Sequence, residues 1–241
     1  MDENYRHCEA LVRSADKDRF LATLFAPADK RGPLFGLYAF NVEIASVRQR
    51  AREPMPGEIR LQWWRDVING ERAGEAAANP IAAALIEIIA RFSLPKARLV
   101  DLLEAHAFDL YDDPMPTFEA LEGYVRQTSA AILDLAARIC GAHVEHASER
   151  GGLAYGITTL LRTFALNASR RQLFVPLEAL LPQLPAAPMP AFLPVALVPG
   201  HLSAMEELGY EPFKPAAEVP QWRRQWVLWR AARQWSRVMQ R

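Results

Sequence analysis

Apolar residues recur at helical spacing along most of this chain, and that periodicity limits the possible folds more than any other feature. Segments such as NPIAAALIEIIARF place apolar residues at i, i+3 and i+4, which is the spacing of one helix face. The pattern holds from the start of the chain to about residue 180, and no stretch of useful length alternates as a β-strand would. We therefore expect an all-α domain.

Capping and turn residues divide this pattern into separate helices. Proline is favoured in the first turn of a helix, and glycine often follows its last turn. The chain is 51% apolar, so these helices can bury a substantial core. Helices are predicted from Asp16 or Asp18 to near Pro27, from Gly32-Pro33 to about Arg52, along GEIRLQWWRDVING, along NPIAAALIEIIARF, from Pro95 to Pro114, from Thr117 to Gly141, and over about 147–168.

Residues 182–220 differ in composition from the rest of the chain because they contain nine prolines. We expect this segment to form ordered, irregular structure that wraps over the helical body, not a linker between domains. On this interpretation a single domain spans residues 1–241.

The chain closes with QWRRQWVLWRAARQWSRVMQR, which is predicted to form a basic, Trp-rich helix. Trp222, Trp226 and Trp229 fall on one stripe of that helix, and several arginines surround them. Three interpretations are open: peripheral contact with a membrane interface, insertion into a groove of a partner protein, or docking of the tryptophans onto the helical body. We favour the last.

Composition excludes several classes of protein. The formal net charge is zero, so no overall electrostatic attraction to nucleic acid is expected. Cys8 and Cys140 are far apart and form no CxxC pair, which argues against a disulfide framework or a zinc module. The N-terminal residues are polar, and no apolar run approaches the roughly 18 residues that a membrane span needs. We expect a soluble, cytoplasmic protein whose only membrane contact is peripheral, at the inner membrane.

Several stretches together are similar to one known family. LYAFNVEIA, LQWWRDVINGERAG, AFDLYDDP, YVRQTSAAILDLAARICG and GLAYGITTLLRTFALNASRRQLFVPLEAL occur in that order. Over about residues 5–240 the chain resembles the squalene/phytoene synthase family. The resemblance implies an isoprenoid (terpenoid) synthase-like helical bundle around a central cavity. It also implies an ancestral activity that joins two allylic diphosphates with magnesium held by two Asp-rich motifs on facing helices.

The residues at those two motif positions do not fit magnesium. The first motif falls on Ala45, Ser46, Val47, Arg48 and Gln49, and in the second Thr163 and Asn167 stand where aspartates are expected. Magnesium prefers carboxylate, phosphate and water oxygens, and ionisation of a diphosphate needs its charge neutralised. We therefore expect no catalytic residues of the family type, no metal site and no cofactor, magnesium included.

AFNVEIA and the LR…SRR pattern resemble a degenerate branch of the family, related to mitochondrial complex I (NADH dehydrogenase) assembly factor 6 and its bacterial counterparts. The resemblance implies a non-catalytic protein that acts in complex I assembly, through contacts with a complex I subunit, an assembly protein or a lipid. The alternative is a prenyltransferase-like enzyme with an altered, metal-independent pocket.

Two groups of residues are candidate ligand contacts. Guanidinium groups suit phosphate oxygens, so arginines near the motif positions could bind an anionic ligand directly, although they could also be ordinary paired cations. Aromatic side chains on the same helices could line a prenyl or phospholipid tunnel, or simply fill the core. The candidates are Arg48, Arg162, Arg170, Arg171, Tyr38, Phe40 and Tyr155.

Two further groups invite a metal interpretation. Asp109, Asp112 and Asp113 lie near a predicted helix end, where adjacent acids are usually solvated. His143 and His146 follow Gly141, and sequence offers no third ligand. We expect neither group to bind metal.

Overall fold

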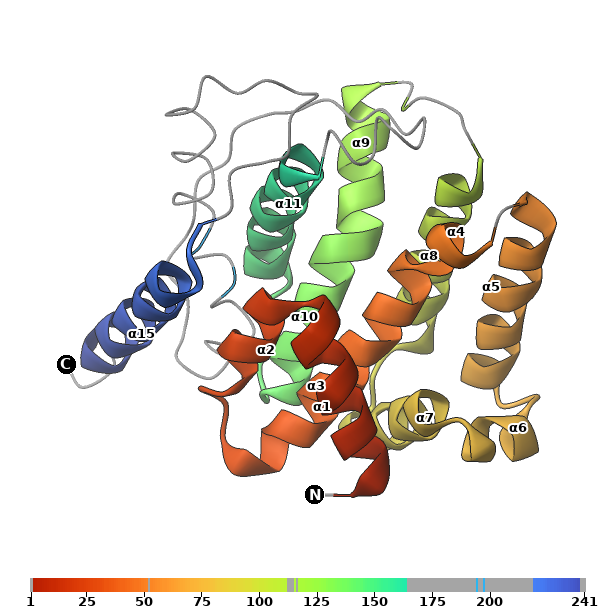
Figure 1. The fold of residues 1–241 in the computed structure, drawn as a ribbon, viewed down its shortest axis with the longest axis horizontal. Helices are drawn as coiled ribbons and strands as arrows, with labels where there is room; N and C mark the ends of the chain where they lie inside the picture. The colour runs from red at the N-terminus through yellow and green to blue at the C-terminus, as the bar shows by residue number, and fades with distance from the viewer. Residues whose placement is uncertain are drawn as a thin grey trace.

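A computed structural model describes residues 2–51, 53–111, 115, 117–163, 194, 197 and 219–238. Among these residues the regular elements are helical (Figure 1). None of the described helices is both long enough and apolar enough to span a bilayer. The α-helices are α1 (Glu3–Ala15), α2 (Lys17–Thr23), α3 (Ala28–Ala45), α4 (Val47–Arg50), α5 (Pro54–Asn69), α6 (Ala73–Ala78), α7 (Pro80–Phe92), α8 (Lys96–Ala107), α9 (Phe118–Val125), α10 (Ala131–Ile139), α11 (Glu145–Arg162) and α15 (Gln221–Val238).

Helix boundaries follow local capping chemistry where the sequence signal is strong. The side chains of Asp16, Asn79 and Thr117 accept hydrogen bonds from backbone N–H groups in the first turns of α2, α7 and α9. Gly70 and Gly141 follow α5 and α10 with φ of 95° and 87°, a conformation that costs glycine little.

Four of the predicted helices differ in detail from the observed ones. Helix α3 begins at Ala28, so Pro33 lies inside it, and the predicted single helix is interrupted at Ser46 before α4. The helix predicted to reach Pro114 ends as an α-helix at Ala107 and continues as a short 3-10 turn, η1 (Phe108–Leu110). The helix predicted over 147–168 is α11, which ends at Arg162. The predicted helix from Thr117 to Gly141 is present, but a π-helical turn, η2 (Arg126–Ala130), joins α9 to α10.

The main core lies around α3, whose middle is buried on all sides. Leu34, Phe35, Leu37 and Phe40 are almost fully covered, because α1, α7 and α10 pack around this helix. Because the middle of α3 is buried on all sides, its sequence is apolar around the whole helix and has no clear polar face.

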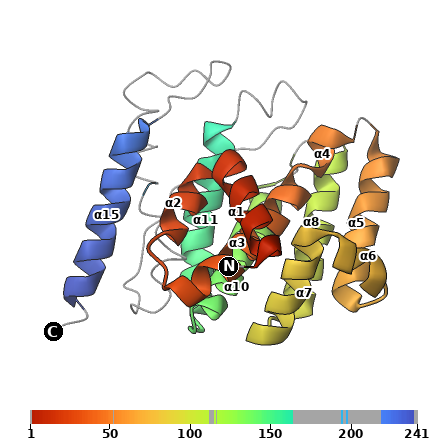
Figure 2. The ribbon, with the colours of Figure 1, turned by 60° about the horizontal axis from the view of Figure 1, so that its bottom comes forward.

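Helix α15 lies along one edge of the bundle, and α5 and α6 lie at the opposite edge (Figure 2). It docks against α2 through Leu228, which is buried with Leu21, Ala22 and Leu197. The three tryptophans are exposed instead, with 70%, 51% and 46% of Trp222, Trp226 and Trp229 accessible to solvent. The prediction that they dock onto the helical body is therefore wrong. Except for residues 194, 197, 219 and 220, the Pro-rich segment lies outside the described residues, so its wrapping role stays a prediction.

Candidate functional site: a cavity between α3–α4 and α11

A cavity of about 570 Å³ lies inside the bundle. The ends of α3 and α8, the short elements α4 and η1, the join between α9 and η2, and the second half of α11 all contribute to its wall, and Arg19 of α2 lies at one side. Its volume falls within the range of small-molecule sites.

The first motif segment forms one wall. Ala45, Ser46, Arg48 and Gln49 all line the cavity, together with Asn41 one turn earlier. The opposite wall comes from α11, where Tyr155, Thr159 and Thr163 line the same space. The two segments expected to carry the family's metal motifs thus share one cavity, as the resemblance predicts. Asn167, the other position of the second motif, lies outside the described residues.

Glu43, the one acid in the stretch FNVEIASVRQ, does not line the cavity. The residue is 7% exposed, and its carboxylate accepts hydrogen bonds from Arg50 at 2.7 Å and from Arg60 of α5 at 2.6 Å. Burial alone would raise the pKa of Glu43, but the two guanidinium groups outweigh it and hold this pKa below its ordinary value. Glu43 therefore joins α3 and α4 to α5 as an anion.

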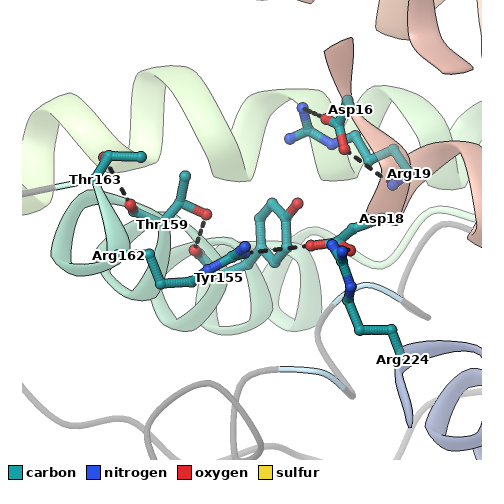
Figure 3. A network of polar contacts seen from close by, with 8 residues as sticks. All are labelled: Asp16, Asp18, Arg19, Tyr155, Thr159, Arg162, Thr163 and Arg224. Carbon is teal, nitrogen blue, oxygen red and sulfur yellow. Dashed lines mark hydrogen bonds and ion pairs between the residues drawn. The ribbon is translucent and has the colours of Figure 1, made fainter. Parts of the chain in front are cut away.

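The candidate arginines occupy different environments. Arg48 lines the cavity, and its Nη1 donates to the carbonyl of Ala51 at 3.3 Å. Arg162 is not among the lining residues, and its Nη1 lies 3.3 Å from Oδ2 of Asp18 (Figure 3). Arg170 and Arg171 lie outside the described residues, so their predicted role stays a prediction. Of the candidate arginines that the structure describes, Arg48 is the one that lines the cavity.

Asp18 links three helices through its two carboxylate oxygens. Besides contacting Arg162 of α11, it accepts a hydrogen bond from Arg224 Nη1 of α15 at 2.9 Å. Figure 3 shows both guanidinium groups directed at this carboxylate. Asp18 and Arg224 are both buried, so this is an internal ion pair and not a surface contact.

Sequence reasoning missed Arg19, which lies beside the cavity and is itself buried. Its guanidinium binds Asp16 at 3.3 Å and lies 5.3 Å from the ring centres of both Tyr38 and Tyr155. Burial would lower the pKa of Arg19, but the Asp16 carboxylate offsets this and keeps the pKa above its ordinary value. Burial raises the pKa of both tyrosines, so their hydroxyls stay protonated.

The three aromatic candidates lie in different places relative to the cavity. Tyr155 lines the cavity and Tyr38 does not, although both contact Arg19. Phe40 is fully buried and packs edge-on against Trp64, with ring centres 5.1 Å apart. This is a core contact between α3 and α5.

Asp109, one of the acids considered for a metal, belongs to a second polar group whose other members the sequence did not indicate. Asp109 accepts hydrogen bonds from Tyr124 at 2.9 and 3.1 Å, and its Oδ2 lies 2.7 Å from Nδ1 of His106. Burial, together with the charge of Asp109, raises the pKa of Tyr124 well above its ordinary value, so its phenol remains a hydrogen-bond donor. All three residues line the cavity. A periodic helix pattern gives no signal for this group, because its members come from three different elements.

Among the described residues, the donor set of the cavity does not fit a magnesium cluster. The described carboxylates that line it belong to Asp16 and Asp109, and each already binds neighbouring side chains. Within the part of the chain that the structure describes, no three His, Cys, Asp or Glu side chains lie together as metal ligands would. The hydroxyl groups of Thr128, Thr159 and Thr163 donate to carbonyls four residues earlier in the chain, as Thr159 does to Tyr155 at 2.8 Å.

This fold and this cavity define an isoprenoid synthase-type protein. A crystal structure of a dehydrosqualene synthase superposes with a TM-score of 0.80 over 97% of both chains, at 14% sequence identity. A crystal structure of a squalene synthase from Alicyclobacillus acidocaldarius superposes with a TM-score of 0.57 over 97% of this chain and 94% of that chain, at 18% sequence identity. The sequence pattern of the squalene/phytoene synthase family matches residues 12–184. The chain belongs to that family.

The chain is similar in sequence to complex I assembly factors and to phytoene synthases. Complex I assembly factor 6 of Bos taurus is 31% identical over 176 residues, which cover 72% of this chain and 53% of the relative. The Homo sapiens protein is also 31% identical, and the match covers 71% of this chain and 53% of the relative. The chain thus spans about half the length of these relatives. A 15-cis-phytoene synthase of Synechococcus elongatus is 22% identical over 75% of this chain and 63% of its own.

Proposed function

We propose that this protein acts in the assembly of respiratory complex I as a non-catalytic member of its family. One observation carries the proposal: the two motif segments face one cavity, yet their described cavity-lining residues include no carboxylate. The 31% identity to complex I assembly factor 6 supports the same conclusion. A subunit or another assembly protein of complex I is the proposed partner, and the predicted cytoplasmic location belongs to the same proposal.

We propose further that the cavity binds an anionic ligand with an apolar tail, without magnesium. Arg48 supplies a guanidinium in the cavity wall, which suits phosphate oxygens. Val42, Ala45 and Leu160 give other parts of the wall an apolar surface. A prenyl diphosphate and a phospholipid share this chemistry, and titration with each of them distinguishes the two.

The assembly role is tested in the organism that carries the gene. Deletion should reduce the amount of assembled complex I on native gels and leave squalene- and phytoene-type products unchanged, and the intact gene should restore assembly. Normal complex I in the deletion strain would refute the proposal.

The ligand proposal is tested by titration calorimetry with a prenyl diphosphate and with a short-chain anionic phospholipid. Arg48→Ala should weaken binding by about tenfold or more, since a hydrogen bond to a charged group contributes about 1.5–3 kcal/mol. Arg91→Ala, on α7 and away from the cavity, is the matched control and should bind as the unsubstituted protein does. No binding of either ligand, or binding that requires magnesium, would contradict the proposal.

The competing proposal is that the protein is a prenyltransferase with an altered mechanism. The hydrogen-bonded group of His106, Asp109 and Tyr124 favours this proposal. Its hydrogen-bonded phenol and imidazole lie in the cavity wall, where they could orient a reacting ligand. Purified protein given farnesyl or geranylgeranyl diphosphate with magnesium should form no squalene, phytoene or presqualene diphosphate above a boiled control. If product forms and Tyr124→Phe abolishes it, the enzyme interpretation replaces ours.

A further inference from the structure

Helix α15 presents two unlike faces. Arg224 and Leu228 are buried against the bundle, with Val227 and Ala231 partly covered beside them. At about 100° per residue, Trp222, Trp226 and Trp229 fall within an arc of about 60° on roughly the opposite side of the helix. Because α15 lies along an edge of the molecule (Figures 1 and 2), this aromatic row points away from the bundle.

Arginine accompanies the aromatic row. Gln221–Val238 contains five arginines and no aspartate or glutamate. Arg224 is buried and paired with Asp18. Arg230 and Arg233 are exposed and stack on the row, with Cζ 5.4 Å from the Trp226 ring centre and 4.6 Å from that of Trp229. We call Trp222, Trp226, Trp229, Arg230 and Arg233 the Trp–Arg face. Its charge is positive, and its apolar rings lie beside that charge.

The shape of the Trp–Arg face favours a bilayer over a folded partner. The three indoles form a convex ridge about 10 Å long on a straight helix. A protein partner would need a groove cut to fit that ridge. A lipid interface needs no matching groove, because it deforms around the rings, and indole groups partition to the level of the headgroups. Anionic headgroups at the same depth complement the stacked guanidinium groups.

We infer that the Trp–Arg face is a docking surface for a bilayer that contains anionic phospholipid. The ion pair between Asp18 and Arg224, together with burial of Leu228, fixes α15 with this face outward. The surface is separate from the cavity, so docking does not depend on any ligand bound there.

The test is flotation of the full chain with vesicles of phosphatidylcholine alone and of phosphatidylcholine mixed with phosphatidylglycerol. The mixed vesicles should bind more of the protein, and added salt should weaken binding. Each arginine near an anionic surface contributes about 1 kcal/mol, so the pair Arg230→Gln and Arg233→Gln should weaken binding by about tenfold or more. The pair Trp226→Ala and Trp229→Ala should weaken it at least as much.

A matched control removes exposed apolar side chains from another part of the protein. Met55 and Ile59 of α5 are 68% and 64% exposed, and α5 lies at the opposite edge of the molecule, so Met55→Ala with Ile59→Ala should float as the unsubstituted protein does. The inference is wrong if the unsubstituted protein does not bind the mixed vesicles. It is also wrong if the variant with Trp226→Ala and Trp229→Ala binds them as well as the unsubstituted protein does. If the tryptophan pair floats normally but loses capture of complex I subunits, the Trp–Arg face is a protein interface and the inference is wrong.

Discussion

Gly152 allows α11 to approach the π-helical turn so closely that no side chain fits between them. A Cβ atom added at Gly152 would lie 2.2 Å from the Cα of Ala130 and 2.7 Å from its backbone nitrogen. Carbon atoms in good contact are about 3.5–4.0 Å apart, so Gly152→Ala must separate the two segments by more than 1 Å. The obstacle is backbone inside a continuous helix, and it cannot move aside as the end of a flexible side chain would.

The expected loss of stability follows from two opposing effects. Overpacking a well-filled site costs about 1–3 kcal/mol, and a backbone clash belongs at or above the upper end of that range. Replacing glycine with alanine in a helix interior recovers about 1 kcal/mol. Gly152→Ala should therefore lower the free energy of unfolding by about 2 kcal/mol, which for a domain of this size lowers Tm by about 4–8 °C.

Gly123→Ala is the matched control, because Gly123 is also helical and a Cβ there would meet nothing within 4 Å. That variant should be as stable as the unsubstituted protein or up to about 1 kcal/mol more stable. Thermal and urea unfolding followed by circular dichroism would measure both. If Gly152→Ala proves as stable as Gly123→Ala, the close approach of α11 to the π-helical turn is refuted.

Two further predictions concern buried carboxylates. Because the pKa of Glu43 lies below its ordinary value, its stabilisation is full above that value and is lost as pH falls toward the lowered pKa. Glu43→Gln should lower the free energy of unfolding by about 2 kcal/mol at neutral pH and by progressively less in acid. Glu71 is exposed, so Glu71→Gln should change the free energy of unfolding little at any pH. If urea unfolding shows the same loss for Glu43→Gln at every pH, the prediction is contradicted. Asp18→Asn removes the negative charge that pairs with Arg224, at a cost of about 3 kcal/mol, so trypsin should cleave α15 faster than in the Asp29→Asn control. Equal cleavage would refute the anchoring role.

Much of the fold was predictable because its signals are local. The apolar spacing of NPIAAALIEIIARF and the capping residues Asn79 and Thr117 fix helices through contacts within a few residues, and the predicted and observed segments agree there. Where the prediction was wrong, the deciding contacts were distant. Pro33 was expected in the first turn of α3, yet the buried surroundings of this segment stabilise a helix that begins at Ala28.

The candidate site was predictable to the extent that it lies on those helices. Family resemblance placed Ala45, Ser46, Arg48 and Thr163 on facing segments, and all four line the cavity. It could not find the group formed by His106, Asp109 and Tyr124, because nothing in the sequence states that three separate elements meet.

The sequence by itself determined an all-α chain and a cationic, tryptophan-rich last helix, since helical period and charge are properties of neighbouring residues. Only the tertiary structure decided which way each charged or aromatic side chain faces. It turned Glu43 toward Arg60 and away from the cavity, and it paired Arg162 with Asp18. It also buried Leu228 and left Trp226 in solvent, because one internal carboxylate on α2 holds α15 by the opposite side. Orientation about a helix axis depends on partners far along the chain, and periodicity alone does not name them.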